Sequence, residues 1–186
     1  MFHVEHKYTI GIMTTEEIKN SIRNIPDFPI KGVQFKDITT ALKDGKVLKE
    51  IAQDMYETYK DKGLTKIVGI ESRGFILGAI LAEKLGVGFV PIRKKGKLPA
   101  ETNTVSYEKE YGIDEIEMHK DALTPDDVVL IHDDLLATGG TMLAAEKLIQ
   151  QFGVKKVYLH FIIELDEFNA RSLFEHPENV QSMLHF

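Results

Sequence analysis

The chain has 186 residues, of which 43% are hydrophobic and 28% charged, a composition typical of one soluble globular domain. The net charge of -6 argues against a nucleic-acid-binding surface, because phosphate backbones select basic domains. The absence of cysteine excludes a disulfide scaffold, a thiolate nucleophile and a Cys-based zinc site, and it fits a reducing compartment such as the cytoplasm.

The first predicted elements follow an N-terminal stretch, residues 1–13, that we expect to be a loose extension. Thr14, with Glu17 three residues later, is typical of a helix N-terminus closed by a capping box. Apolar residues at helical spacing predict a second helix from Val47 to Tyr59, closed by Gly63.

Strands and helices then alternate along the chain, and two of the strands are almost entirely apolar. This pattern predicts an α/β fold with a mainly parallel twisted sheet flanked by helices, in a single domain over residues 1–186. The longest apolar run, Gly74 to Ala82, is too short to cross a bilayer, so we expect no membrane partner. The predicted strands are Lys66 to Ile70, Gly88 to Arg93, Val128 to His132 and Lys156 to Ile163, and the predicted helices are Gly74 to Leu85 and Gly140 to Phe152.

A further strand is predicted by the alternation of Ile116 and Met118 with Glu115 and Glu117, which places the two glutamates on an exposed face.

The stretch after the strand that ends at His132 carries the strongest functional signal. Two acids, Asp133 and Asp134, are followed by a turn of small residues and then by a helix. Glycines let several backbone amides point at one place, and a helix N-terminus adds positive potential, so the turn predicts a cradle for a phosphate monoester. The two acids would repel a phosphate but accept hydrogen bonds from sugar hydroxyls one ring away. The alternative is an ordinary acidic turn with a glycine-rich helix cap. The turn is Ala137-Thr138-Gly139-Gly140-Thr141.

Val129 to Thr141 resembles the ribose-phosphate signature of the type I phosphoribosyltransferases, and its ending from Leu135 is most similar to the adenine-specific members of that family. The resemblance covers roughly Ile18 to Leu165. Other similar segments are Phe28-Pro29, Gly32, Phe35 to Thr39, Glu71 to Phe75, Arg93 to Pro99 and Glu110 to Gly112.

The resemblance implies a type I phosphoribosyltransferase fold with a flexible flap at residues 93–112 and a small N-terminal hood. It implies transfer of 5-phosphoribose from phosphoribosyl pyrophosphate to N9 of adenine, which yields AMP and pyrophosphate in purine salvage, and it implies a homodimer. The implied cofactor is Mg²⁺, held by substrate and water rather than directly by the protein, and Asp133 and Asp134 would hold the ribose hydroxyls, either directly or through Mg-bound water.

The same resemblance implies the roles of individual residues. Asp133, Asp134, Arg73 and Glu110 are the expected catalytic residues, with Arg73 at the leaving pyrophosphate and Glu110 managing the proton at adenine N7. Read alone, Glu110 is an ordinary surface glutamate. The expected phosphoribosyl pyrophosphate ligands are Glu71, Ser72, Arg93, Lys94, Lys97, Tyr111, Leu135, Ala137, Thr138, Gly139, Gly140 and Thr141, and the expected base-site residues are Gln34, Phe35, Lys36 and Leu165.

Other features keep two readings. The basic run Arg93 to Lys97 is either a solvated hairpin or the start of a flap that closes on pyrophosphate. Phe35 would stack on adenine in the family, but by itself it reads as a core residue. The family also implies a cis peptide between Glu71 and Ser72. His132 stands where an apolar residue is usual, and we interpret it as a hydrogen-bonded histidine rather than a catalyst.

Two competing functions stay open. The same fold could act on hypoxanthine or xanthine. A phosphoribosyl-pyrophosphate-sensing regulator that binds nucleic acid would call for a basic face or an added winged-helix segment, and neither the net charge nor the short N-terminal region supplies one.

Overall fold

The computed structural model describes residues 13–109 and 112–186, and the chain divides into two compact units, residues 1–51 and residues 52–186. The division falls within the third helix. In its described part the N-terminal unit contains α1 (Thr15–Asn20), β1 (Arg23–Pro26), β2 (Gln34–Asp37), α2 (Thr39–Leu42) and the start of α3 (Gly45–Tyr59).

The N-terminal unit begins with the predicted capping box. The Thr14 hydroxyl accepts a hydrogen bond from the Glu17 amide, and the Glu17 carboxylate accepts one from the Thr14 amide at 2.7 Å. β1 and β2 then pair as an antiparallel hairpin that runs from Arg23 opposite Asp37 to Pro26 opposite Gln34. The sequence analysis did not predict this hairpin.

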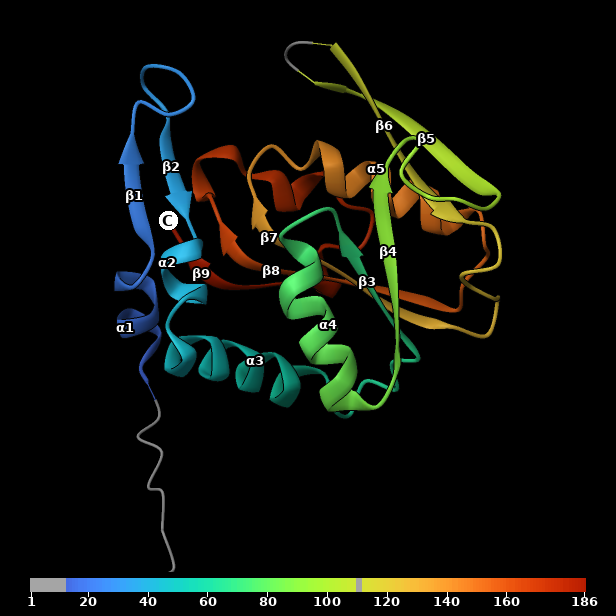
Figure 1. The fold of residues 1–186 in the computed structure, drawn as a ribbon, viewed down its shortest axis with the longest axis horizontal. Coiled ribbons are helices and arrows are strands. Elements are labelled where there is room, and N and C mark those ends of the chain that lie inside the picture. The colour runs from blue at the N-terminus through green and yellow to red at the C-terminus, as the bar shows by residue number, and fades with distance from the viewer. Residues whose placement is uncertain (1–12, 110–111) are drawn as a thin grey trace, which may run out of the picture. The chain divides into compact units, whose positions relative to one another are not determined.

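The larger unit is built on one seven-stranded sheet with the strand order β5-β6-β4-β3-β7-β8-β9 (Figure 1). The five strands from β4 to β9 in that order are parallel neighbours, and β6 and β5 add an antiparallel hairpin beside β4. The predicted mainly parallel α/β fold is confirmed. Its elements are β3 (Lys66–Ile70), α4 (Gly74–Leu85), β4 (Gly88–Lys94), β5 (Thr102–Lys109), β6 (Gly112–His119), β7 (Val128–Leu136), α5 (Gly140–Gln150), β8 (Lys156–Glu164), η1 (Asp166–Phe168), η2 (Ala170–Leu173), η3 (Pro177–Asn179) and β9 (Val180–His185).

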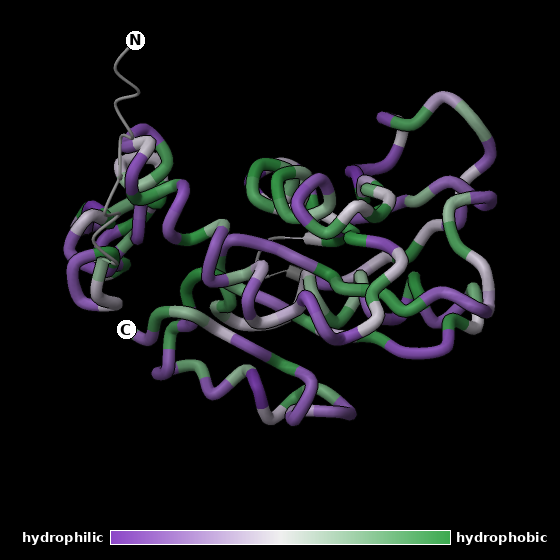
Figure 2. The backbone as a smooth tube through the Cα atoms, turned by 90° about the horizontal axis from the view of Figure 1, so that it is seen from below, coloured by the Kyte–Doolittle hydropathy of each residue, from purple (hydrophilic) through white to green (hydrophobic). Residues whose placement is uncertain are grey.

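Helices α4 and α5 cover opposite faces of this sheet. On one face Gly78 of α4 lies against Phe89, His132 and Ile67, with too little room for a larger side chain to enter freely. The other face of the sheet packs against α5. Val68 of β3 and buried residues of β7 join α5 there in the main apolar core. Figure 2 shows hydrophobic stretches running through the interior and hydrophilic ones common on the peripheral loops. The packing of α4 and α5 against the two faces of the sheet fixes the positions of the strand ends.

Two predictions about individual strands were wrong. β7 does not end at His132 but continues to Leu136, because its ladder with β8 runs on to Leu136 opposite Glu164. The two acids therefore lie within a strand. Glu117 is not on an exposed face but is buried with 4% of its surface exposed. In the part of the chain that the structure describes, no helix combines the length and apolar character needed to cross a membrane.

Candidate active site

The predicted phosphate loop lies where β3 and β7 end. These strands are parallel neighbours, so the chain leaves both at the same edge of the sheet, where ligands bind in such folds. A cleft opens at this edge, and all residues from Asp133 to Thr141 line it. Arg73, which follows β3, and Phe161 of β8 line the same cleft. The structure thus brings Arg73 to the ribose-phosphate residues, as expected, and adds Phe161, which the sequence analysis missed.

The turn after β7 and the start of α5 form the cradle. Gly139 adopts a φ of +82°, a conformation that glycine tolerates better than other residues. The carbonyl of Gly139 accepts the first bond of the helix, from the Leu143 amide at 2.9 Å. The amides at the helix start therefore have no acceptor within α5, and the first turn carries no acidic residue that would repel an anion. This geometry suits a phosphate group.

The acid pair beside the cradle is electrostatically strained. Burial, followed by the negative charge of Asp134, raises the pKa of Asp133 well above its usual range. Burial also raises the pKa of Asp134, although the guanidinium of Arg73 opposes this rise. Arg73 Nε lies 2.6 Å from Asp134 Oδ2. Adjacent carboxylates, one buried and one half-buried, with a single arginine favour a further positive charge or several hydroxyl donors.

The end of β4, which carries basic residues, borders the same site. Arg93, at the end of β4, donates two hydrogen bonds to the carboxylate of Glu71, at 3.2 Å from Nε and 3.0 Å from Nη2. The amide of Lys94 also donates to Glu71 Oε2 at 3.1 Å. The guanidinium of Arg93 lowers the pKa of Glu71, with a smaller contribution from Lys97. The peptide between Glu71 and Ser72 is cis, which confirms the prediction.

A second cleft connects these groups to the acid pair, because Asp133 and Thr141 line both clefts. Tyr107 of β5 reaches this cleft, and its hydroxyl lies 3.3 Å from Thr141 Oγ1. Tyr107 was missed because the stretch around it is polar and was predicted as part of a flexible flap; an aromatic residue in such a polar stretch was the available signal. The second cleft is lined by Ile70, Glu71, Ile92, Arg93, Lys94, Tyr107, Ile116, Asp133 and Thr141.

The residues expected to bind the base are divided between the two units. Phe35 of β2 is half-buried in the N-terminal unit, with its ring edge-on to Phe28 at 5.2 Å between centroids. The side chain of its neighbour Gln34 accepts a hydrogen bond from Asn24 at 2.7 Å. Lys36 lies on the same strand. Leu165, in the larger unit, follows β8 and donates its amide to the carbonyl of Leu136 at 2.9 Å.

Two expected site residues, Glu110 and Tyr111, lie outside the described residues. They fall between the two strands of the hairpin formed by β5 and β6.

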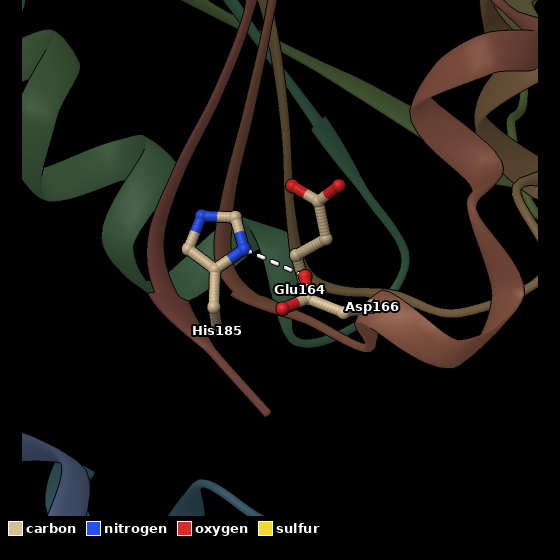
Figure 3. A group of neighbouring side chains, drawn as sticks. All are labelled: Glu164, Asp166 and His185. Atoms are coloured by element: carbon tan, nitrogen blue, oxygen red, sulfur yellow. Dashed lines mark hydrogen bonds and ion pairs between the residues drawn. The ribbon is translucent and has the colours of Figure 1, made fainter.

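A group of potential metal ligands stands at the ends of β8 and β9 (Figure 3). Asp166 accepts a hydrogen bond from His185 Nδ1 at 2.8 Å, and Glu164 lies beside them. However, both oxygens of Glu164 are occupied: Arg171 donates to them at 3.3 and 2.6 Å, and the Ser182 hydroxyl donates to Oε2. The negative charge of Glu164 is thus already compensated, and we interpret the group as an ion-pair network that ties η2 to β8 and β9.

Comparison with known proteins agrees with this geometry. A model of the phosphoribosyl transferase domain matches residues 35–179. The chain is 60% identical over 175 residues to an adenine phosphoribosyltransferase of Bacteroides fragilis, covering 93% of this chain and 98% of that protein. The crystal structure of adenine phosphoribosyltransferase from Rhodothermus marinus has a TM-score of 0.86 at 48% identity, covering 92% of this chain and 98% of that one. The Giardia lamblia enzyme, solved in complex with 9-deazaadenine, has a TM-score of 0.89 at 42% identity, covering 94% and 98%.

Proposed function

The chain belongs to the phosphoribosyltransferase family, and from that premise we propose that it transfers 5-phosphoribose from phosphoribosyl pyrophosphate to N9 of adenine. The products are AMP and pyrophosphate, as in purine salvage. The observation that carries this proposal is the cleft that a phosphate cradle and the acid pair at the end of β7 line together. A phosphorylated ribose presents a matching phosphate and hydroxyls.

The reaction is a single displacement. The lone pair of adenine N9 forms a bond to C1 of the ribose as the bond from C1 to the pyrophosphate oxygen breaks, and the proton that adenine carries at N7 passes to the carboxylate of Glu110. Positive charge develops on the sugar ring during such a glycosyl transfer. Asp133 and Asp134 lie where the cradle would place the sugar, so their negative charge stabilises this state.

The residues at the end of β3 and β4 suit the leaving pyrophosphate. Arg73 borders the cradle cleft, and Arg93 and Lys94 border the adjoining one. Their positive charges favour an anionic leaving group, and a guanidinium fork matches phosphate oxygens. The ion pairs of Arg73 with Asp134 and of Arg93 with Glu71 fix these side chains before substrate arrives.

Mg²⁺ belongs to the proposal as the cofactor. The acid pair fits it, because burial, followed by the negative charge of Asp134, raises the pKa of Asp133, so a nearby cation would favour its ionised form, and oxygen donors are what Mg²⁺ prefers. Asp133 and Asp134 would hold the ion, directly or through water, together with oxygens of the donor substrate. When bound, the ion supplies charge neutralisation at the pyrophosphate.

The remaining roles rest on the family resemblance. Phe35 would stack on adenine, Leu165 would pack on its other face, and main-chain groups of Gln34 and Lys36 would read its edge. Glu110 would manage the proton at N7, on a flap at residues 93–112 that closes over the substrate and excludes water. A homodimer in the cytoplasm completes the proposal.

An assay for AMP formation tests the proposed function. Purified protein, adenine and phosphoribosyl pyrophosphate with Mg²⁺ should yield one pyrophosphate for each AMP, and chelation of Mg²⁺ should abolish the reaction. Binding of phosphoribosyl pyrophosphate without any AMP formation would contradict the proposal and favour a sensor protein.

A further inference from the structure

The buried carboxylate of Glu117 lies beneath the basic turn that follows β4. Glu117 sits in the middle of β6, opposite Arg93 of β4 on one side and Thr104 of β5 on the other. Only 4% of its surface is exposed. No cation forms an ion pair with it among the described residues, so the burial of its charge must be offset in another way.

Backbone amides of the turn provide that compensation. Glu117 Oε1 accepts hydrogen bonds from the amides of Lys97 and Leu98, both at 2.9 Å. Glu117 Oε2 accepts one from the Thr102 hydroxyl at 3.3 Å. Burial raises the pKa of Glu117, but hydrogen bonds from the amides of Leu98, Gly96 and Lys97 outweigh it, and the pKa lies below its usual value. The carboxylate is therefore ionised and bound to the turn at neutral pH.

Other contacts show that the turn depends on this anchor. Gly96 has a φ of +80°. Apart from its hydrogen bond to Glu117, the Lys97 amide makes a long bond of 3.3 Å to the carbonyl of Lys94. Arg93 Nη1 donates to the carbonyl of Lys97 at 3.1 Å. Arg93 thus holds the turn from one side and Glu117 holds it from the other. Without Glu117, the amides of Lys97 and Leu98 would donate to water instead, and the turn would lose its fixed shape.

The turn carries two lysines, Lys94 and Lys97, for which the described part of the chain shows no salt bridge within 4 Å. Its third lysine, Lys95, is held by both oxygens of Glu115, at 2.9 and 2.8 Å. Lys94 borders the cleft shared with Asp133, and Lys97 lowers the pKa of Glu71 in that cleft. A turn of fixed shape keeps Lys94 at the cleft and Lys97 close enough to act on Glu71, and preorganised charges bind an anion without the cost of ordering them.

We propose that Glu117 is a positioning residue for the donor substrate: by clamping the amides of the turn at 94–98, it holds Lys94 and Lys97 where they bind the pyrophosphate of phosphoribosyl pyrophosphate. This inference rests on the proposed function. Glu117 itself acts through the turn rather than by touching the substrate, and its charge is solvated by the two amides that it accepts from. Loss of the clamp removes binding energy that is present both before and during the reaction, so it raises KM rather than lowering kcat.

The variants Glu117→Ala and Glu117→Gln test the clamp. Alanine removes every acceptor, and we expect the KM for phosphoribosyl pyrophosphate to rise about 10-fold or more, with kcat and the KM for adenine changed less than about 3-fold. Glutamine keeps one oxygen for the two amides but loses the charge, so it should restore most of the affinity. Glu101→Gln is the matched control: Glu101 is exposed and pairs with Lys120, which is not part of the turn, so both KM values should stay unchanged.

Several outcomes would overturn the clamp. One is an unchanged KM for phosphoribosyl pyrophosphate in a folded Glu117→Ala protein, and another is a parallel loss of kcat and of both affinities, which would indicate a merely structural role. If the alanine variant does not fold, Glu117→Asp decides, because its shorter side chain keeps the charge but lengthens the bonds to the two amides: a clearly raised KM for phosphoribosyl pyrophosphate supports the clamp and an unchanged KM refutes it. If the wild-type protein makes no AMP, the proposed function fails by itself, and the Kd for Mg-phosphoribosyl pyrophosphate in the same variants still tests the clamp.

Discussion

Acid should destabilise this protein through a buried pair of histidines. His132 on β7 and His160 on β8 expose 0% and 2% of their surface. His132 Nδ1 lies 3.2 Å from the carbonyl oxygen of His160 and 3.0 Å from His160 Nδ1, so His132 carries its proton on Nδ1 and donates to both. Burial lowers the pKa of His132 to about 4 and that of His160 well below its usual value. Both rings are therefore neutral in the fold.

The size of the effect follows from proton linkage. His132 has a pKa of 6.5 in the unfolded chain and about 4 in the fold, so below 6.5 the unfolded state binds more protons. The free energy of unfolding then falls as the pH falls, until the pH reaches about 4. At about 1.4 kcal/mol for each pKa unit, His132 alone should cost about 2 kcal/mol between roughly pH 7.5 and pH 5. His160 acts in the same direction.

Urea unfolding of the wild-type protein and of His132→Leu at both pH values provides the test. At neutral pH the variant should be less stable by about 1–3 kcal/mol, because His160 loses its partner. The informative quantity is the loss between the two pH values, which should be smaller in the variant by about 2 kcal/mol. Burial raises the pKa of Asp133, so protonation of this residue stabilises the fold as the pH falls. That contribution is present in both proteins. An equal loss in both proteins would refute the reasoning.

Two further predictions concern the cleft. The double variant Asp133→Asn, Asp134→Asn keeps hydrogen-bonding capacity but removes negative charge. Turnover should fall by about 10²-fold or more, while donor affinity measured by calorimetry changes much less. A wild-type turnover would show that the carboxylates have another role. In Gly74→Ala the new Cβ would lie 2.5 Å from the backbone oxygen of His132, so α4 or β7 must move. The protein should therefore lose activity and about 1–3 kcal/mol of stability measured by urea unfolding. Gly45→Ala, with nothing within 4 Å, is the control and should unfold like the wild type.

The sequence predicts what is encoded locally. The capping box at Thr14, the helix after Gly74 and the loop from Ala137 to Thr141 depend on neighbouring residues and appear as expected. The alternation of strands and helices also sufficed for the parallel sheet, because few other arrangements bury two apolar strands. The loop then lies at the edge of the sheet, where parallel strands leave their ligand sites.

What the sequence did not reveal depends on partners that are distant in the chain. β7 extends to Leu136 because β8 continues to pair with it, and that pairing is invisible in the local pattern. Glu117 reads as an exposed position in an alternating strand, yet the turn at 96–98 and Thr102 cover it and use its charge. Tyr107 meets Thr141 only through the fold. In each case a tertiary contact, rather than residue preference, decided the outcome.

The most direct test of the account compares adenine with hypoxanthine as the acceptor, at saturating Mg-phosphoribosyl pyrophosphate. A site that satisfies the 6-amino group of adenine leaves polar groups unpaired when a 6-oxo purine binds, a penalty that can reach about 10⁴-fold in kcat/KM. We predict AMP formation from adenine with one pyrophosphate released per turnover, and a kcat/KM for hypoxanthine lower by about 10²-fold or more. Comparable kcat/KM values for the two bases, or no nucleotide formed from adenine, would contradict the account.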